Sequence, residues 1–415
     1  MTAVLSRAQV ITVLFSLCLL LGACAAREPD PVDAAAAGEV IKSPNDTRDY
    51  RALTLDNGMK VLLVSDPEAD KAAASVDVNA GSNADPRDFA GLAHFLEHML
   101  FLGTAAYPEA GEYQEYIAAH GGSHNAYTAY ENTNYYFDVD AAYLEPALDR
   151  FSQFFIAPLF TPAYVDRERN AVHSEYQSGL QDDGRRGYSA LKAVMNPQHP
   201  LTGFSVGSLD TLQDRPGMTL RDALLAHYDR YYSANLMAVA ISGPQTLEEL
   251  EVLARRFFSP VVNRERTPPQ NDAALFAPGT LPALLALEPV RDSRSVTYTF
   301  PIPSMREHYR SKPLNHIGHL LGHEGEGSLL SLLRARGWAN GLSAGGGFSY
   351  EDASTFTVSV ALTEAGVANL DDITALVFQF IELARQEGIE EWIHDELRVM
   401  AELAFRYQEQ GSPVS

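Results

Sequence analysis

The first half of the chain alternates apolar and polar positions in short runs that predict β-strands separated by tight turns. Residues 51–66 form an expected hairpin, because Asn57-Gly58 favours the left-handed backbone of a two-residue turn. Further strands are expected at residues 72–81, 124–130, 133–140 and 235–243. Apolar residues spaced along one helical face predict helices at residues 91–103, 110–120, 141–157 and 246–258. Another helix is expected to begin at Thr161, which can cap it, with Pro162 in its first turn.

A second copy of this plan follows a segment rich in proline and charge at residues 261–280, which we interpret as an interdomain linker. Beyond it, strands are expected at 294–302 and 354–362, and helices at 366–386 and 389–408. The order of a strand, a helix and a long polar helix recurs in both halves. This recurrence predicts an α+β fold of two repeated domains, each a mostly antiparallel sheet packed with helices.

The predicted domains occupy residues 50–260 and 281–415, and the chain of 415 residues, 46% of them apolar, can form both cores. No strand follows the last expected helix, so the second domain is expected to be truncated. The formal net charge of −23 excludes nucleic acid as an expected partner, because such binding needs a basic surface.

The N-terminus predicts an export signal. A single Arg7 precedes an apolar run and small residues, which is typical of a signal peptide at residues 1–23. The sequence LGAC, which ends at Cys24, resembles the lipobox of bacterial lipoproteins, in which the cysteine carries lipid. An ordinary cleaved signal and an uncleaved anchor are the alternatives. Residues 24–49 then form a tether to the body of the protein.

The lipobox resemblance implies a lipoprotein of the bacterial cell envelope that faces the periplasm. Ala25 directly follows Cys24, at the position where Asp would favour retention in the inner membrane, so the outer membrane is the expected location. Contact with the membrane would then be through the N-terminal lipid alone. Because Cys18 would be removed with the signal, the mature chain would have no disulfide.

The stretch GLAHFLEHMLFLGT, residues 91–104, carries the candidate chemistry. On a helix, His94 and His98 lie one turn apart on one face, and Glu97 lies on the same side. Two imidazoles at this spacing can bind one Zn²⁺ ion, and the carboxylate can take a proton from water. The alternative is an ordinary helix packed on a sheet with histidines at its polar edge.

A third metal ligand is available on the helix that follows Pro162. Glu168 and Glu175 are seven residues apart and share one face of that helix, and His173 lies between them. Spacing alone does not decide between Glu175 and His173 as the third ligand.

The run GSNADPRDFAGLAHFLEHMLFLGT resembles the active-site signature of the pitrilysin/insulysin family of inverted-zincin peptidases, in its long single-chain branch. The later segment ERNAVHSEYQ is similar to that family's segment with the third ligand. The resemblance implies one zinc ion per chain, bound by His94, His98 and Glu175, with Glu97 as general base. It also implies that Glu168 orients a metal-binding histidine.

The resemblance extends to substrate binding. The segment GGSHNAYTAYENTNYYFDV is similar to the family's edge strand, which implies that Asn125 and Ala126 contact a peptide added as a further strand. In the second copy, residues 316–345 resemble a family segment that binds the substrate N-terminus at an exosite. The positions that match this exosite are Gly322, Glu324, Leu342 and Ser343.

His316, His319 and His323 also have a spacing that could bind metal. A second metal site is not expected there, because glycines interrupt the run and no carboxylate lies between the histidines. The segment instead aligns with the metal-binding helix of the first copy, as a copy without the base.

The sequence therefore predicts a zinc-dependent endopeptidase that acts on peptides or small proteins. The alternative is a non-catalytic or partner-dependent peptide-binding subunit of the same fold. The resemblance implies a C-terminal half that closes over the substrate, and no segment of this chain matches it. We therefore expect a fragment or truncated gene product. The alternatives are a chain that works with a separate partner and a degenerate, poorly active protein.

Overall fold

The computed structural model describes residues 40–388, 390–408 and 411, so the expected signal peptide and Cys24 lie outside the described residues. Six strands form the first sheet in the order β1-β2-β6-β3-β5-β4. These strands are β1 Asp49–Thr54, β2 Lys60–Ser65, β3 Lys71–Val78, β4 Ser123–Thr128, β5 Thr133–Asp140 and β6 Met237–Gly243. Only the β2–β6 pair of this sheet is parallel, so the expected antiparallel character and the hairpin at residues 51–66 are confirmed.

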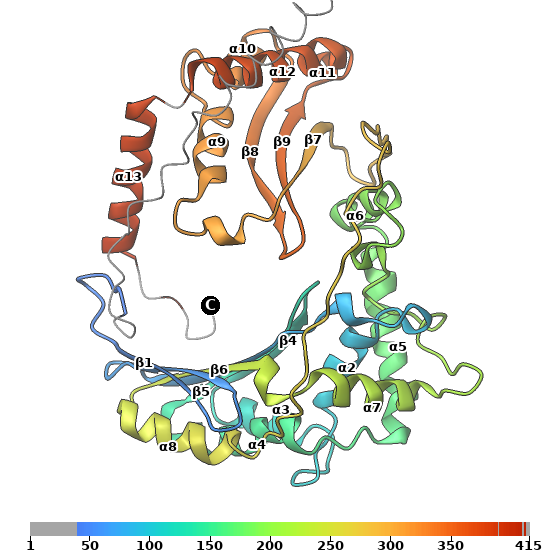
Figure 1. Cartoon of the computed structure of the whole chain (residues 1–415), viewed down its shortest axis with the longest axis vertical. Coiled ribbons are helices and arrows are strands. Elements are labelled where there is room, and N and C mark those ends of the chain that lie inside the picture. The colour runs from blue at the N-terminus through green and yellow to red at the C-terminus, as the bar shows by residue number, and fades with distance from the viewer. Residues whose placement is uncertain (1–39, 389, 409–410, 412–415) are drawn as a thin grey trace, which may run out of the picture. The chain divides into compact units, whose positions relative to one another are not determined.

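Helices cover the apolar face of this sheet (Figure 1). These helices are α2 Leu92–Leu100, α3 Glu112–Ala119, α4 Leu144–Ile156, α7 Leu220–Tyr231 and α8 Leu247–Phe258. Two further helices, α5 Pro162–Gly179 and α6 Asp183–Ala193, lie to the side of the sheet. Short 3₁₀ turns lie at η1 Ser82–Ala84, η2 Arg87–Phe89, η3 Ala141–Tyr143, η4 Pro200–Thr202 and η5 Ala234–Leu236. Two helices, α6 and α7, were not predicted. Thr161 precedes α5 as expected, but its side chain makes no capping hydrogen bond.

Strand β3 shows why this sheet has one apolar and one polar face. Ala74, Val76 and Val78 are buried in the core, whereas Ser75 and Asp77 point to the other face, because successive strand residues alternate. There the Ser75 hydroxyl donates to Asn134 Oδ1 at 3.1 Å. The helices therefore pack on the face to which Ala74, Val76 and Val78 point.

The second sheet has three antiparallel strands in the order β7-β9-β8. They are β7 Ser295–Ile302, β8 Ala339–Ser349 and β9 Ser354–Leu362, accompanied by η6 Arg306–His308, α9 Pro313–Leu321, α10 Leu329–Ala335, α11 Glu364–Val367, α12 Leu370–Glu387 and α13 Glu391–Arg406. A separate apolar core links this sheet to its helices. The expected α+β architecture is confirmed. Strand β8 was not predicted, because its four glycines weaken the alternating pattern.

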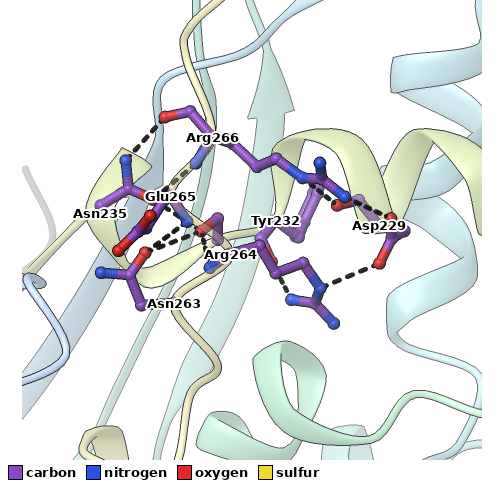
Figure 2. A network of polar contacts seen from close by, with 8 residues as sticks. Asp229, Tyr232, Asn235, Asn263, Arg264, Glu265 and Arg266 are labelled. Atoms are coloured by element: carbon purple, nitrogen blue, oxygen red, sulfur yellow. Dashed lines mark hydrogen bonds and ion pairs between the residues drawn. The ribbon is translucent and has the colours of Figure 1, made fainter.

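The segment after α8 is fastened to the first sheet's domain. Asp229 of α7 accepts hydrogen bonds from Arg264 Nε at 3.0 Å and Arg266 Nη2 at 2.7 Å (Figure 2). The Asn235 side chain also donates to the Arg266 carbonyl at 2.7 Å. The beginning of the expected linker is therefore an ordered part of the first domain's surface. No helix among the residues described is long and apolar enough to cross a membrane.

A contact between two glycines fixes where α2 begins. Gly91 has a φ of +88°, and a Cβ atom there would lie 2.3 Å from the Gly207 nitrogen. Gly91→Ala should therefore lower the free energy of unfolding by about 2–5 kcal/mol, from left-handed strain and overpacking together. Denaturant unfolding followed by circular dichroism measures this change.

Gly217→Ala is the matched control. Its φ is +84°, but a Cβ atom there would meet nothing within 4 Å. It should cost only the backbone strain of about 1–2 kcal/mol. Equal losses in the two variants would show that the Gly91–Gly207 contact does not position α2.

Candidate metal centre

Helix α2 is held at its N-terminus by the carboxylate of Asp85, a half-buried residue. Asp85 accepts hydrogen bonds from the backbone N–H groups of Gly91 at 2.8 Å and Ala93 at 2.7 Å. These N–H groups have no partner within the helix, so the carboxylate satisfies them. Burial raises the pKa of Asp85 to about 7, and the two hydrogen bonds oppose that rise. The cap fixes the first turn, from which His94 projects.

The rings of His94 and His98 face one another. Their Nε2 atoms are 3.2 Å apart, and the ring planes meet at 88°. On the far side, His94 Nδ1 lies 2.6 Å from the Val206 carbonyl, and His98 Nδ1 lies 2.8 Å from Glu168 Oε1. A carbonyl or carboxylate oxygen can only accept, so each Nδ1 carries the proton and each Nε2 presents a lone pair.

Helix α5 runs past α2 and brings a third donor to the same point (Figure 1). One oxygen of Glu175 lies 3.5 Å from His94 Nε2, and the other lies 3.5 Å from His98 Nε2. His173 turns elsewhere, since its Nε2 lies 3.4 Å from the Gln177 amide and its Nδ1 accepts from the Leu209 N–H at 3.5 Å. Of the two residues that spacing left open, the structure therefore places Glu175 at the imidazoles.

The donor set fits a zinc ion. Nitrogens at about 2.0–2.1 Å from a tetrahedral zinc lie roughly 3.4 Å apart, close to the separation of the two Nε2 atoms. Two lone pairs that face each other at 3.2 Å repel unless a cation lies between them. The Glu175 side chain, half exposed at 51%, can adjust to a cation with little strain.

Glu97 lies beside this point but is oriented by a different partner. Glu97 is only 6% exposed, and its Oε2 accepts a hydrogen bond from the Thr128 hydroxyl at 2.5 Å. His94, Glu97 and His98 each offer a ligand atom within 4.8 Å of the others. Strand β4 thus holds one oxygen of a carboxylate that lies beside the imidazoles.

The electrostatics of the site reflect its buried carboxylates. Burial raises the pKa of Glu97, and the Thr128 hydrogen bond and the two histidines oppose the rise. Burial alone would lower the pKa of His98. The Glu168 hydrogen bond and the charges of Glu175 and Glu97 outweigh this, so the pKa of His98 is raised. The site therefore carries negative potential that favours a cation.

These groups line a cleft of about 560 Å³ that is bordered on one side by strand β4. Within its sheet, β4 pairs only with β5, so its other edge is free to pair with a further strand. Asn125 is exposed and Ala126 half-buried, and both line the cleft. The structure thus places both predicted substrate-contact residues next to the metal-binding groups.

The four predicted exosite residues lie in the second domain. Gly322 ends α9, and Glu324 follows it and forms an ion pair with Arg334 at 3.2 Å. Leu342 and Ser343 lie on β8, the strand that packs beside α9. The structure therefore brings these residues to one region, while their role as an exosite stays a prediction.

Three groups of the site were missed from the sequence. They are the Asp85 carboxylate, the Thr128 hydroxyl and the Val206 carbonyl. The N-terminus of a helix gives a weak signal for Asp85, because acidic residues often precede helices. No pattern marks the other two, since tertiary contacts bring them to the site.

Two models of known protein families match this chain. The model of Insulinase (Peptidase family M16) matches residues 60–198, and that of the Peptidase M16 inactive domain matches residues 219–399. The second match begins inside the range expected for the first domain, so the domain boundaries stay a prediction.

Named relatives and a solved structure are similar over most of the chain. The insulin-degrading enzyme of Homo sapiens is 43% identical over 377 residues, which cover 90% of this chain and 37% of the relative. A Schizosaccharomyces pombe protein named as a zinc protease is 41% identical over 373 residues, 89% of this chain and 38% of that protein. The crystal structure of pitrilysin superposes with a TM-score of 0.85 at 35% identity and covers 90% of this chain and 40% of that one.

This chain thus spans less than half the length of each of these proteins. Within that span, the two family models together match most of the chain. The chain belongs to the insulinase family of peptidases, which includes pitrilysin.

Proposed function

We propose that this protein is a zinc-dependent endopeptidase in which His94, His98 and Glu175 bind the metal. The observation that carries the proposal is the convergence of three donors within 3.5 Å of one another beside a buried carboxylate. Zinc bound there supplies a Lewis acid that activates water and polarises a peptide carbonyl. One zinc ion is proposed for this centre.

Glu97 is proposed as the general base. Its carboxylate is buried with one oxygen held by Thr128, so the other oxygen can accept a proton at the cleft. Burial raises its pKa, which is the direction that suits a group that takes a proton and then returns it to the leaving amine. Thr128 is a positioning residue, because it touches Glu97 rather than the reacting atoms.

Glu168 is proposed as the residue that orients His98. Its hydrogen bond at 2.8 Å holds the His98 proton on Nδ1 and turns the Nε2 lone pair toward the metal. The Val206 carbonyl does the same for His94. These two contacts orient both imidazole rings for metal binding before the metal binds.

Peptides are the proposed substrates. The free edge of β4 can pair with an extended peptide and lay it beside the metal-binding groups, with Asn125 and Ala126 in contact. The relatives' name, insulin-degrading enzyme, supports peptides or small proteins as the substrate class. Gly322, Glu324, Leu342 and Ser343 are proposed to bind the substrate N-terminus. The chain covers 37% of that relative, so full activity is proposed to involve a further segment or a separate partner chain.

The general-base proposal is tested by Glu97→Gln. This variant should retain zinc, because its ligands are unchanged, and lower kcat/KM for a quenched peptide by about 10²–10⁴-fold. His94→Ala and Glu175→Ala should lose zinc as well as cleavage.

Glu115→Gln, exposed on α3, is the control for Glu97→Gln and should cleave at the parent rate. Peptide cleavage by Glu97→Gln at that same rate would refute the assignment. Bound zinc with peptide binding but no chelator-sensitive cleavage in the parent would favour the non-catalytic subunit instead.

The orienting role of Glu168 predicts a change in metal affinity. Glu168→Ala should weaken zinc binding at this centre by about 10–100-fold, because His98 loses its orienting partner. Competition with a chromophoric chelator measures it. Asp166→Ala, at an 85% exposed position on the same helix, should not change the affinity. Equal affinities in the two variants would contradict the role of Glu168.

Lipid attachment at Cys24 is proposed from the N-terminal sequence. It would tether the protein to the envelope, facing the periplasm, most naturally at the outer membrane. Cys24→Ser should move the protein from the membrane fraction to the soluble fraction and remove the lipid mass from its N-terminal peptide. An unchanged membrane fraction would contradict lipidation.

A further inference from the structure

Helices α9 and α13 of the second domain bring a second set of metal-binding groups together (Figure 1). His319 and His323 come from α9 and its C-terminal end, and Glu396 comes from α13. His319 Nε2 lies 3.2 Å from Glu396 Oε2. Ligand atoms of all three residues lie within 4.8 Å of one another. Glu396 was not predicted as a ligand, because only the packing of α13 on α9 brings it close to the histidines.

This cluster repeats the arrangement of the first domain. In the first domain both histidines lie on α2, whereas in the second His319 lies on α9 and His323 just beyond its end. In each domain the two histidines are four residues apart, and a later long helix adds a glutamate. The ring planes of His319 and His323 meet at 75°, close to the 88° between His94 and His98. Their ring centroids are 5.7 Å apart against 4.7 Å in the first domain, so the second cluster is more open.

The second cluster lacks a general base for a structural reason. Gly322 stands in the position that Glu97 takes in the first domain, one residue before the second histidine. A Cβ atom on Gly322 would lie 3.3 Å from the Ala344 nitrogen, and one on Gly318 would lie 2.9 Å from the Ala344 carbonyl oxygen. Because α9 packs so closely on β8, this helix leaves no room for a carboxylate there.

We propose that His319, His323 and Glu396 form a second, non-catalytic site for Zn²⁺ or a similar divalent ion. Imidazole and carboxylate ligands suit zinc, and the separation of 3.2 Å between His319 and Glu396 is close to the roughly 3.4 Å expected around a tetrahedral ion. The bound ion would link α13 to α9. Metal binding at this site would therefore stabilise the second domain. The proposed number of zinc ions is then two per chain, whereas the sequence predicts one.

The second site binds more weakly than the first. The Gly325 N–H donates to His323 Nδ1 at 3.1 Å, so this ring must give up that contact to present an orienting proton there. Glu396 is 45% exposed and His319 is 21% exposed, which leaves both open to water. His316 and His394, whose rings stack at 5.6 Å, lie nearby as further imidazoles between the same two helices.

Zinc stoichiometry in site-directed variants tests the proposal. The metal-free chain is titrated with zinc against a chromophoric chelator, and bound zinc is counted after gel filtration. The parent should bind two ions, of which the weaker has about 10-fold or more lower affinity. His94→Ala with His98→Ala should keep only the weaker ion, and His319→Ala with His323→Ala only the tighter one.

Two further measurements guard against misfolded variants. Glu396→Gln, which keeps the side chain's size, should weaken only the second ion. In the His94→Ala, His98→Ala background, zinc should raise the melting temperature, because a ligand that binds only the folded state stabilises it. Adding Glu396→Gln to that background should remove the rise. His308→Ala, an exposed histidine outside the cluster, should keep both ions.

The outcomes separate this site from the proposed peptidase centre. A single ion that is lost with His94 and His98 would overturn the second site and leave the peptidase centre intact. A single ion that is lost only with His319 and His323 would overturn the peptidase centre and leave the second site intact.

Discussion

The facing of the His94 and His98 rings is the interaction on which the rest of the site depends. Two Nε2 atoms at 3.2 Å present lone pairs to the same point only because each Nδ1 has an acceptor on its far side. Those acceptors are the Val206 carbonyl and the Glu168 carboxylate, which lie far away in the sequence. Tertiary contacts therefore hold the Nδ1 side of each imidazole, and the Nε2 side remains available to a cation.

The need to orient both imidazoles explains several contacts that position α2, α5 and β4. Gly91 lets α2 begin against Gly207, and the same contact brings Val206 to His94. The Asp85 carboxylate then fixes the first turn of the helix. Helix α5 has to pass α2 so that Glu168 meets one side of His98 and Glu175 the other. The edge position of β4 completes the arrangement, since it holds Glu97 through Thr128 and offers a free edge at the cleft.

The sequence predicted what local geometry decides. His94, Glu97 and His98 share a helical face, so their proximity follows from the spacing alone. Glu175 and His173 could not be separated in this way, because which of them faces α2 depends on how α5 is rotated in the packed domain. Thr128 and Glu396 were missed for a related reason: each reaches its site only through the packing of one element on another. Strand β8 was missed because glycine carries no apolar signal.

The central claim is that one zinc ion is bound by His94, His98 and Glu175, with Glu97 beside it but not bound to it. X-ray diffraction from crystals of the zinc-loaded protein, measured on both sides of the zinc absorption edge, tests this most directly. The account predicts an anomalous peak about 2.0–2.2 Å from both Nε2 atoms and from a Glu175 oxygen. A peak bound by Glu97 in place of Glu175, or no peak between the two imidazoles, would contradict it.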